Sequence, residues 1–146
     1  WTWQRARAER ALAASDTLAV IAQRGNQLLG FGIMTCGEER AHLLLFAVSP
    51  AARRTGVGTR LLDWLEVCAR EAGVAHITLE VRATARDARA FYEARGFAPV
   101  RLLHGYYQRR EHGVAMRKDL LDPTLEEPPG ENPLERIFKD ALGSNP

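Results

Sequence analysis

The chain has 146 residues, a length typical of one domain that can bury a substantial core without disulfides or structural metals. Hydrophobic residues make up 46% and charged residues 26%, which indicates a globular protein, and the net charge of +2 is too small to indicate nucleic-acid binding on its own. Two cysteines, Cys36 and Cys68, are too few for a disulfide framework or a cysteine-rich zinc site, so we expect packing residues.

Nothing in the sequence indicates a signal peptide, and the longest apolar runs fall well short of the ~20 residues that span a membrane. We therefore expect a cytoplasmic protein. The first residue is Trp1 rather than methionine, which suggests a fragment or a processed form. The histidines show no metal-ligand spacing; no metal site is expected, and each histidine is predicted at the surface or at a strand end.

The first half of the chain predicts a helix at 4–14, rich in alanine and arginine, followed by three strands. The strands are expected at 17–24, 28–36 and 42–48, with short turns between them. The third is a continuous apolar run, which is typical of a strand buried on both faces. Short connections favour an antiparallel meander.

The second half of the chain alternates helices with strands. The predicted elements are an amphipathic helix at 57–72, a strand at 76–82, a helix at 86–95 and strands at 97–104 and 112–118. Because a helix joins the third and fourth strands, these two should form a right-handed parallel βαβ unit.

The tail differs in composition from the rest of the chain. Residues 122–133 hold four of the seven prolines and predict an extended linker, followed by a short amphipathic helix to about residue 142. We therefore predict one domain at 1–121 and a separate tail at 122–146. The apolar face of the tail helix would pack on the domain or on a second copy, which leaves a homodimer open.

A loop bearing arginine and glycine joins the third strand to the amphipathic helix. It reads Arg53-Arg54-Thr55-Gly56-Val57-Gly58-Thr59. The first amides of a helix lack intrahelical partners and the helix dipole favours negative charge there, so this segment predicts an anion site. Neither the phosphate-loop pattern, which needs a lysine after the glycine, nor the dinucleotide pattern, which needs a third glycine, fits. A glycine-rich helix start without a ligand is the alternative.

Two further residues are candidates for chemistry. Glu80 is expected on the polar face of its strand, near the edge where open α/β sheets bind ligands, and a carboxylate there can accept a proton from an amine. Tyr92 follows Phe91 on the second helix. The alternatives are a solvated or ion-paired Glu80 and a half-buried core Tyr92 with its hydroxyl satisfied locally.

Together these segments resemble the GNAT superfamily of N-acyltransferases, whose cofactor loop runs Gln/Arg-x-x-Gly-x-Gly/Ala. Residues 53–58 match that pattern with its arginine option. Residues 47–50, 79–83 and 91–97 are similar in order and spacing to bacterial protein N-terminal acetyltransferases of the RimI type. The resemblance covers about residues 17–118. It implies an α/β (α+β) fold: a mixed central sheet in which an antiparallel meander precedes a βαβ unit with splayed parallel strands, and helices on both faces.

The resemblance also implies an enzyme that moves an acetyl group from acetyl-CoA to a primary amine by direct transfer in a ternary complex. Glu80 would be the general base and Tyr92 the acid that protonates the leaving thiolate. Tyr106 and Tyr107 would lie near the acceptor, which would be a protein N-terminus, a lysine or a small-molecule amine. The residues implied to hold acetyl-CoA are Phe46, Ala47, Val48, Arg53, Arg54, Thr55, Gly56, Val57, Gly58 and Thr59.

The sequence departs from the family pattern at two places. Ala85 stands where the RimI type usually has an asparagine that contacts the cofactor, and the family's first strand and first helix are not evident. A non-catalytic acyl-CoA-binding or sensing module is therefore the alternative function. A nucleic-acid or phosphate-binding domain is a third reading, which would use Arg60 and Arg109-Arg110 beside the arginines of the loop, but the modest net charge opposes it.

Overall fold

The computed structural model describes residue 13 and residues 15–121. Its strands are β1 (Thr17–Arg24), β2 (Gln27–Cys36), β3 (Arg40–Val48), β4 (His76–Arg82), β5 (Ala98–Tyr107) and β6 (Glu111–Asp119). Its helical elements are the short 3-10 turn η1 (Pro50–Ala52) and the helices α2 (Val57–Glu71) and α3 (Arg86–Ala94). None of the helices in the described part of the chain is long and apolar enough to cross a membrane.

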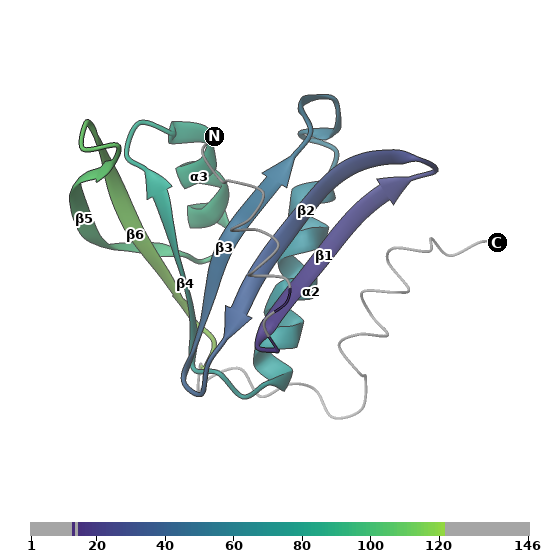
Figure 1. The fold of residues 1–146 in the computed structure, drawn as a ribbon, viewed down its shortest axis with the longest axis horizontal. Helices are drawn as coiled ribbons and strands as arrows, with labels where there is room; N and C mark the ends of the chain where they lie inside the picture. Colours follow the sequence, from purple (N-terminus) through teal and green to yellow (C-terminus); the bar gives the residue numbers. More distant parts are fainter. Residues whose placement is uncertain (1–12, 14, 122–146) are drawn as a thin grey trace.

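The described strands form one mixed sheet in the order β1-β2-β3-β4-β6-β5 (Figure 1). The first three strands pair antiparallel, β3 and β4 pair parallel through the α2 crossover, and the remaining pairs are antiparallel. The predicted meander followed by a βαβ unit is confirmed. The helix predicted at 4–14 and the tail at 122–146 lie outside the described residues, residue 13 excepted, so the proposed domain boundary stays a prediction.

β3 and β4 part halfway along their length. Met34 of β2 pairs with Leu43 and Ile33 pairs with Leu45, so Leu44 of β3 is an extra residue in the ladder. The parallel pairing with β4 ends at the same place, since Leu43 and Leu79 are its last pair. A bulge of this kind bends its strand, and the arrows of β3 and β4 diverge beyond it (Figure 1). A gap therefore opens between residues 44–48 and 80–82.

Helix α2 lies close to the sheet because two glycines of β2 leave room for it. A Cβ added to Gly32 would lie 2.7 Å from Cδ1 of Leu65, and one added to Gly30 would lie 3.0 Å from Cδ1 of Leu61. Leu65 is fully buried against this face. The two glycines that weaken β2 as a strand are thus the residues that allow the helix to approach.

Helix α3 completes the same hydrophobic layer with aromatic side chains. The ring of Phe91 stacks on Phe46 of β3 with centroids 5.8 Å apart, and Tyr92 meets Phe97 edge to face at 5.7 Å. A Cβ on Gly32 would also meet the Phe46 ring, so Phe46 lies on the face that α2 covers. Both described helices therefore cover one face, and His42, Thr78, Glu80 and Arg82 lie on the other.

Candidate active site

Two residues with left-handed backbone conformation precede helix α2. Gly56 caps the helix with φ 88°, and Arg54 in the preceding loop has φ 60°. The first backbone bond of the helix runs from the Arg60 amide to the Gly56 carbonyl, at 3.1 Å, so the amides of the three residues between them have no helical partner. No side chain caps this end, and its first turn holds no acidic residue. The helix start is therefore able to bind an anion through its backbone.

Gly58 fixes this helix start against the rest of the site. A Cβ at residue 58 would lie 3.3 Å from Cγ2 of Val48 and 3.5 Å from the Phe91 ring. The first turn of α2 therefore lies directly against the end of β3 and against α3. A larger residue at this position would displace the helix start from the gap.

Another arginine, Arg95, lies near the two arginines of the loop, Arg53 and Arg54. The Nη2 group of Arg95, just after α3, donates to Oγ1 of Thr59 at 2.7 Å, and its Nε is buried without a hydrogen-bond partner. Arg53 and Arg54 are exposed beside it. Sequence reasoning did not assign Arg95 to the site, because nothing in the chain order shows that the end of α3 returns to the start of α2.

The gap between β3 and β4 is lined by backbone groups that no strand pairs. The amide of Ser49 donates to the Leu29 carbonyl of β2 at 2.8 Å. Because backbone groups alternate in direction along an antiparallel pair, those of Phe46 and Val48 point away from β2 and into the gap. The Val48 carbonyl accepts a hydrogen bond from Nε of Arg53 at 3.3 Å, consistent with that direction. The gap thus offers amide donors to an extended polar ligand.

Glu80 is paired with a histidine. Its Oε2 lies 2.9 Å from Nε2 of His42, and Nδ1 of His42 lies 2.6 Å from Oγ1 of Thr78. The side chains of His42 and Glu80 are 24% and 28% exposed, so both are half-buried. The prediction that every histidine lies at the surface or at a strand end is wrong for His42, which stands inside β3. The pairing depends on strand register, which the sequence does not reveal.

Tyr92 presents its hydroxyl from the helix-covered side of the sheet. The residue is only 8% exposed, and burial, followed by the nearby Tyr107, raises its pKa to about 12. It therefore keeps its proton at neutral pH. Among the described residues, no hydrogen bond engages the Tyr92 hydroxyl. Its ring contacts account for its core position, so the residue is both a core residue and a group with a free hydroxyl.

Tyr107 lies beside Glu80. Burial raises the pKa of Tyr107, and the charges of Tyr106 and Glu80 raise it further, whereas Arg82 lowers it. The guanidinium of Arg82 stacks over the Tyr107 ring at 4.7 Å and pairs with Glu111. The structure thus brings Tyr107 together with both Glu80 and Tyr92.

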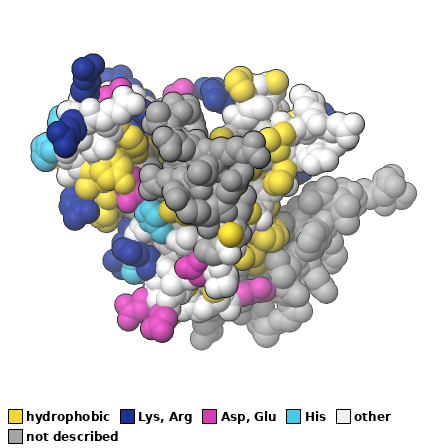
Figure 2. Space-filling model, viewed as in Figure 1, with side chains coloured by type: hydrophobic (Ala, Val, Ile, Leu, Met, Phe, Trp, Pro, Cys, Tyr) yellow, Lys and Arg dark blue, Asp and Glu magenta, His cyan; other side chains and the backbone are white. Residues whose placement is uncertain are grey.

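Tyr106 is placed differently from its neighbour. It is 52% exposed, and its ring meets that of Tyr107 at 5.0 Å. Figure 2 shows hydrophobic side chains bordered by Lys and Arg at the end of the molecule that carries β5 and β6.

The sheet separates the two candidate catalytic groups. Side chains alternate along β4, so Leu79 and Val81 point into the core beneath α2 while Glu80 points to the opposite face. Tyr92 belongs to the core layer. The two groups can therefore act on one reaction only through the gap. Tyr107 interacts electrostatically with both, because Glu80 raises the pKa of Tyr107 and Tyr107 raises the pKa of Tyr92.

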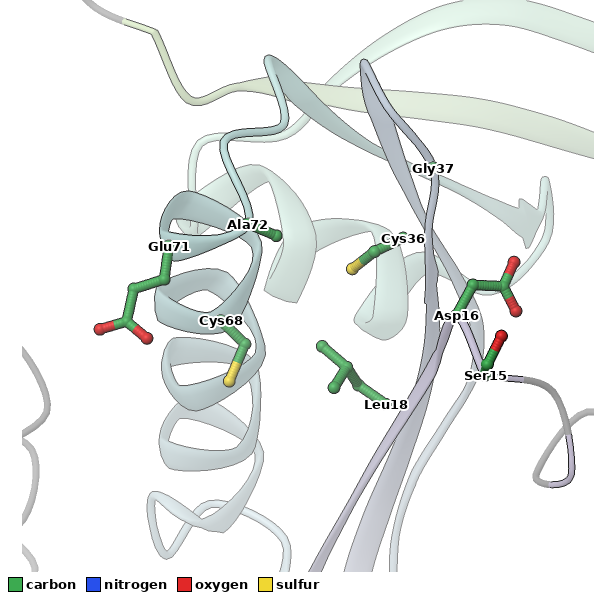
Figure 3. A pocket seen from close by; sticks show the side chains of 8 residues that line it. All are labelled: Ser15, Asp16, Leu18, Cys36, Gly37, Cys68, Glu71 and Ala72. Carbon is green, nitrogen blue, oxygen red and sulfur yellow. The ribbon is translucent and has the colours of Figure 1, made fainter.

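An open cavity of about 470 Å³ lies at the far end of α2, between the helix and the strands β1 and β2. Cys36 and Cys68 line it, as Figure 3 shows, and burial raises the pKa of both thiols. Asp16 and Glu71 also line it. These carboxylates would repel a phosphate, so this cavity does not suit an anionic cofactor. Within the described ranges, no group of three His, Cys, Asp or Glu residues is placed so that it could hold a metal ion, these four included.

The family model that describes the acetyltransferase (GNAT) family matches residues 1–97. The [ribosomal protein bS18]-alanine N-acetyltransferase of Escherichia coli K12 is 36% identical over 96 residues, which make up 64% of this chain and 65% of that protein. The chain thus matches less than two thirds of the length of this relative.

Solved structures share the fold. The crystal structure of the ribosomal-protein-S18-alanine N-acetyltransferase from Escherichia coli has a TM-score of 0.75 and 26% identity, and the match covers 87% of this chain and 84% of that one. A GNAT family acetyltransferase from Elizabethkingia anophelis, solved with acetyl-CoA bound, has a TM-score of 0.71 at 13% identity. The match covers 80% of this chain and 84% of that one. The chain belongs to the acetyltransferase (GNAT) family.

Proposed function

We propose that this protein is an N-acetyltransferase that moves an acetyl group from acetyl-CoA to a primary amine by direct transfer in a ternary complex. One observation carries the proposal: two features meet at the gap beyond Leu43 and Leu79. The uncapped N-terminus of α2 lies at its end, and the carboxylate of Glu80, paired with His42, lies beside it on the face of the sheet that the described helices leave uncovered. The first feature suits a phosphate-bearing donor, and the second suits the deprotonation of an amine.

The residues around the gap fit acetyl-CoA. The free amides at the start of α2 would hold the pyrophosphate, with positive charge from Arg53 and Arg54. The backbone of Phe46 to Val48 would hold the amide-bearing arm along the gap, as an added strand does at a sheet edge. Because residue 58 is a glycine, its backbone lies close to Val48, and a side chain at this position would press against Val48 and Phe91. Acetyl-CoA supplies an acyl group activated as a thioester.

The chain's own groups would then handle the protons. Glu80 accepts a proton from the acceptor ammonium, which frees the nitrogen lone pair to attack the acyl carbon. The amide of Val48 stabilises the negative charge that develops on the acyl oxygen. As the carbon–sulfur bond breaks, Tyr92 donates its proton to the departing sulfur, and the nitrogen, which gained a positive charge on attack, releases its extra proton to solvent to give the amide. Acid–base assistance of this kind contributes about 10²–10⁴-fold to a rate.

We infer further that the acceptor is the N-terminal amine of a protein. The bS18-alanine N-acetyltransferase named above acts on such an amine according to its name. An α-amine has a pKa of about 7.7–8.0 against about 10.4 for lysine, so a single carboxylate base removes its proton far more easily at neutral pH. The exposed Tyr106 beside Tyr107 would contact the first residues of the acceptor chain. A small-molecule amine is the competing acceptor.

Binding and transfer are tested separately. Thermal unfolding with acetyl-CoA at ~100 times its dissociation constant should show stabilisation by about 2.7 kcal/mol, or roughly 5–15 °C. Release of free thiol is then followed with N-terminal peptides, with the same peptides blocked at the α-amine, and with small amines. Glu80→Gln should retain the thermal shift and lose most of the thiol release. Full activity in Glu80→Gln across the pH range would contradict its role as the base.

The alternative function, a non-catalytic acyl-CoA-binding or sensing module, has one observation in its favour. Ala85 stands at the N-cap of α3, where it makes no side-chain hydrogen bond. Such a module would show the thermal shift with acetyl-CoA but no thiol release with any amine. No shift at millimolar acetyl-CoA in a folded sample would contradict both functions.

We also propose a cytoplasmic location and leave the homodimer open to measurement. The mass in solution of the chain with and without residues 122–146 tests whether the tail makes a dimer. The same number of chains per particle in the two samples would contradict the idea that the tail makes a dimer.

A further inference from the structure

We propose that His42 is a positioning residue for Glu80, and that Thr78 selects the tautomer in which His42 does this. The inference rests on the proposed function and adds to it a residue that the family pattern in the sequence did not indicate. The three side chains form a continuous chain of contacts across β3 and β4, from Thr78 through His42 to Glu80.

The hydrogen-bond directions follow from the chemistry of the groups. An ionised carboxylate only accepts hydrogen bonds, so a neutral His42 must carry its proton on Nε2 to donate to Glu80 at 2.9 Å. Its Nδ1 is then an acceptor, and the Thr78 hydroxyl donates to it at 2.6 Å. The hydroxyl of Thr78 thus favours the tautomer that can hold the Glu80 carboxylate.

The same hydroxyl can also follow a change of charge on His42. An imidazolium donates from both nitrogens, so Thr78 would accept from Nδ1 and turn its own hydrogen to the Ala41 carbonyl, 3.4 Å away. The contact between Nε2 of His42 and Glu80 is kept in either case, because Nε2 carries a hydrogen in both.

Other charged or titratable groups lie on the same face of the neighbouring strands. They are Arg40 on β3, His76 and Arg82 on β4, Arg117 with Asp119 on β6, and Arg101 and Tyr107 on β5. Arg82 pairs with Glu111, and Arg117 pairs with Asp119, so both guanidiniums are engaged elsewhere. His42 is the group whose nitrogen contacts the Glu80 oxygen.

Kinetic measurements on matched variants test the role. His42→Ala should lower kcat by roughly 10- to 100-fold with the KM for acetyl-CoA nearly unchanged, because a misplaced base affects the chemical step. His42→Gln keeps an N–H donor, so it should restore most of kcat. His76→Ala, on the same face of β4, is the control and should behave as the wild type.

A spectroscopic measurement tests the inference without any activity. The ¹⁵N shifts of the imidazole should show the Nε2–H tautomer of His42 in the wild type, and a loss of this tautomer in Thr78→Val. An Nδ1–H tautomer in the wild type would overturn the inference, as would wild-type kcat in His42→Ala. A wild type that binds acetyl-CoA but acetylates no amine would instead contradict the proposed function and leave the tautomer result to decide the inference.

Discussion

Leu43 of β3 and Leu79 of β4 form the last pair of the parallel ladder, and the groups assigned to the reaction lie beyond them. Glu80 is the next residue of β4 after this pair. The bulged Leu44 is the next residue of β3. One irregularity in the sheet therefore sets both where the gap opens and where the proposed base, Glu80, lies.

The loop before α2 offers a test in which stability and binding separate. Arg54 has φ 60°, which costs a non-glycine residue about 1–2 kcal/mol, whereas glycine adds about 0.4–1 kcal/mol of chain entropy to the unfolded state. Arg54→Gly should therefore leave the unfolding midpoint of the free protein nearly unchanged or slightly raised. It should reduce the shift produced by acetyl-CoA, because a positive charge is lost.

The control for this variant is Arg24→Gln, which removes an exposed arginine at the end of β1. Calorimetric titration with acetyl-CoA gives the affinities directly. Equal affinities in Arg54→Gly and the wild type would show that Arg54 takes no part in binding the donor.

Tyr92 makes stability depend on pH in the alkaline range. Its pKa is raised to about 12 in the folded protein from 10.0, so folding favours the neutral hydroxyl. This contribution is fully present below about pH 10 and is lost as pH rises from there through about 12. This contribution to the free energy of unfolding is about 3 kcal/mol, because each unit of pKa difference between the folded and unfolded states corresponds to about 1.36 kcal/mol.

Urea unfolding at pH about 9 and about 11.5 measures this effect. The free energy of unfolding should fall between the two values in the wild type, and should fall less in Tyr92→Phe. Tyr107, whose pKa is also raised, keeps part of the slope in the variant. Parallel slopes in the two proteins would mean that Tyr92 is not buried as described.

The two glycines of β2 should respond differently to a methyl group. At Gly30 the obstruction is the backbone carbonyl of Ala47, at 2.8 Å, whereas at Gly32 it is the end of the Leu65 side chain, at 2.7 Å. A side chain can rotate and a strand carbonyl cannot. Overpacking costs about 1–3 kcal/mol, so Gly30→Ala should lie at the upper end of this range or beyond and Gly32→Ala below it. Chemical denaturation of both variants ranks them, and the reverse order would contradict this account.

Ala85 leaves a cap position unused at the start of α3. Ala85→Asn should stabilise the protein by about 1 kcal/mol, because an asparagine side chain accepts a hydrogen bond from a free amide of the first turn. The unfolding midpoint should rise by a few degrees, roughly 2–4 °C. Ala85→Val has no acceptor atom and should give no gain.

A second readout of the same variant concerns the cofactor. If the asparagine also restores the polar contact that the family pattern implies, acetyl-CoA affinity should rise with stability. A gain in stability without a gain in affinity would confine Ala85 to a structural role.

The residue patterns predicted the strands and helices closely because each carries a local signal. The alternation in Thr17–Arg24 and the apolar stripe of Val57–Glu71 read correctly at almost every residue. Leu44 carried no such signal: it sits in a run of apolar residues, and only the partner strand reveals that it is the extra one.

The same limit explains what was missed in the site. Glu80, Tyr92 and the loop before α2 were expected from the family pattern. His42 and Arg95 were not, because each reaches the site through a contact between segments far apart in the chain: with Glu80 and with Thr59, respectively. Contacts that depend on register or on the return of a helix cannot be inferred from local periodicity.

The gap between β3 and β4 has a consequence for the size of the acceptor. For the proposed function, the donor and the acceptor approach from opposite faces of the sheet, so neither has to leave before the other can enter. Only the first atoms of the acceptor need to reach Glu80, and the remainder stays outside the fold. On this proposal the volume of a cavity does not limit the mass of the acceptor, and a folded protein would be as admissible as a short peptide.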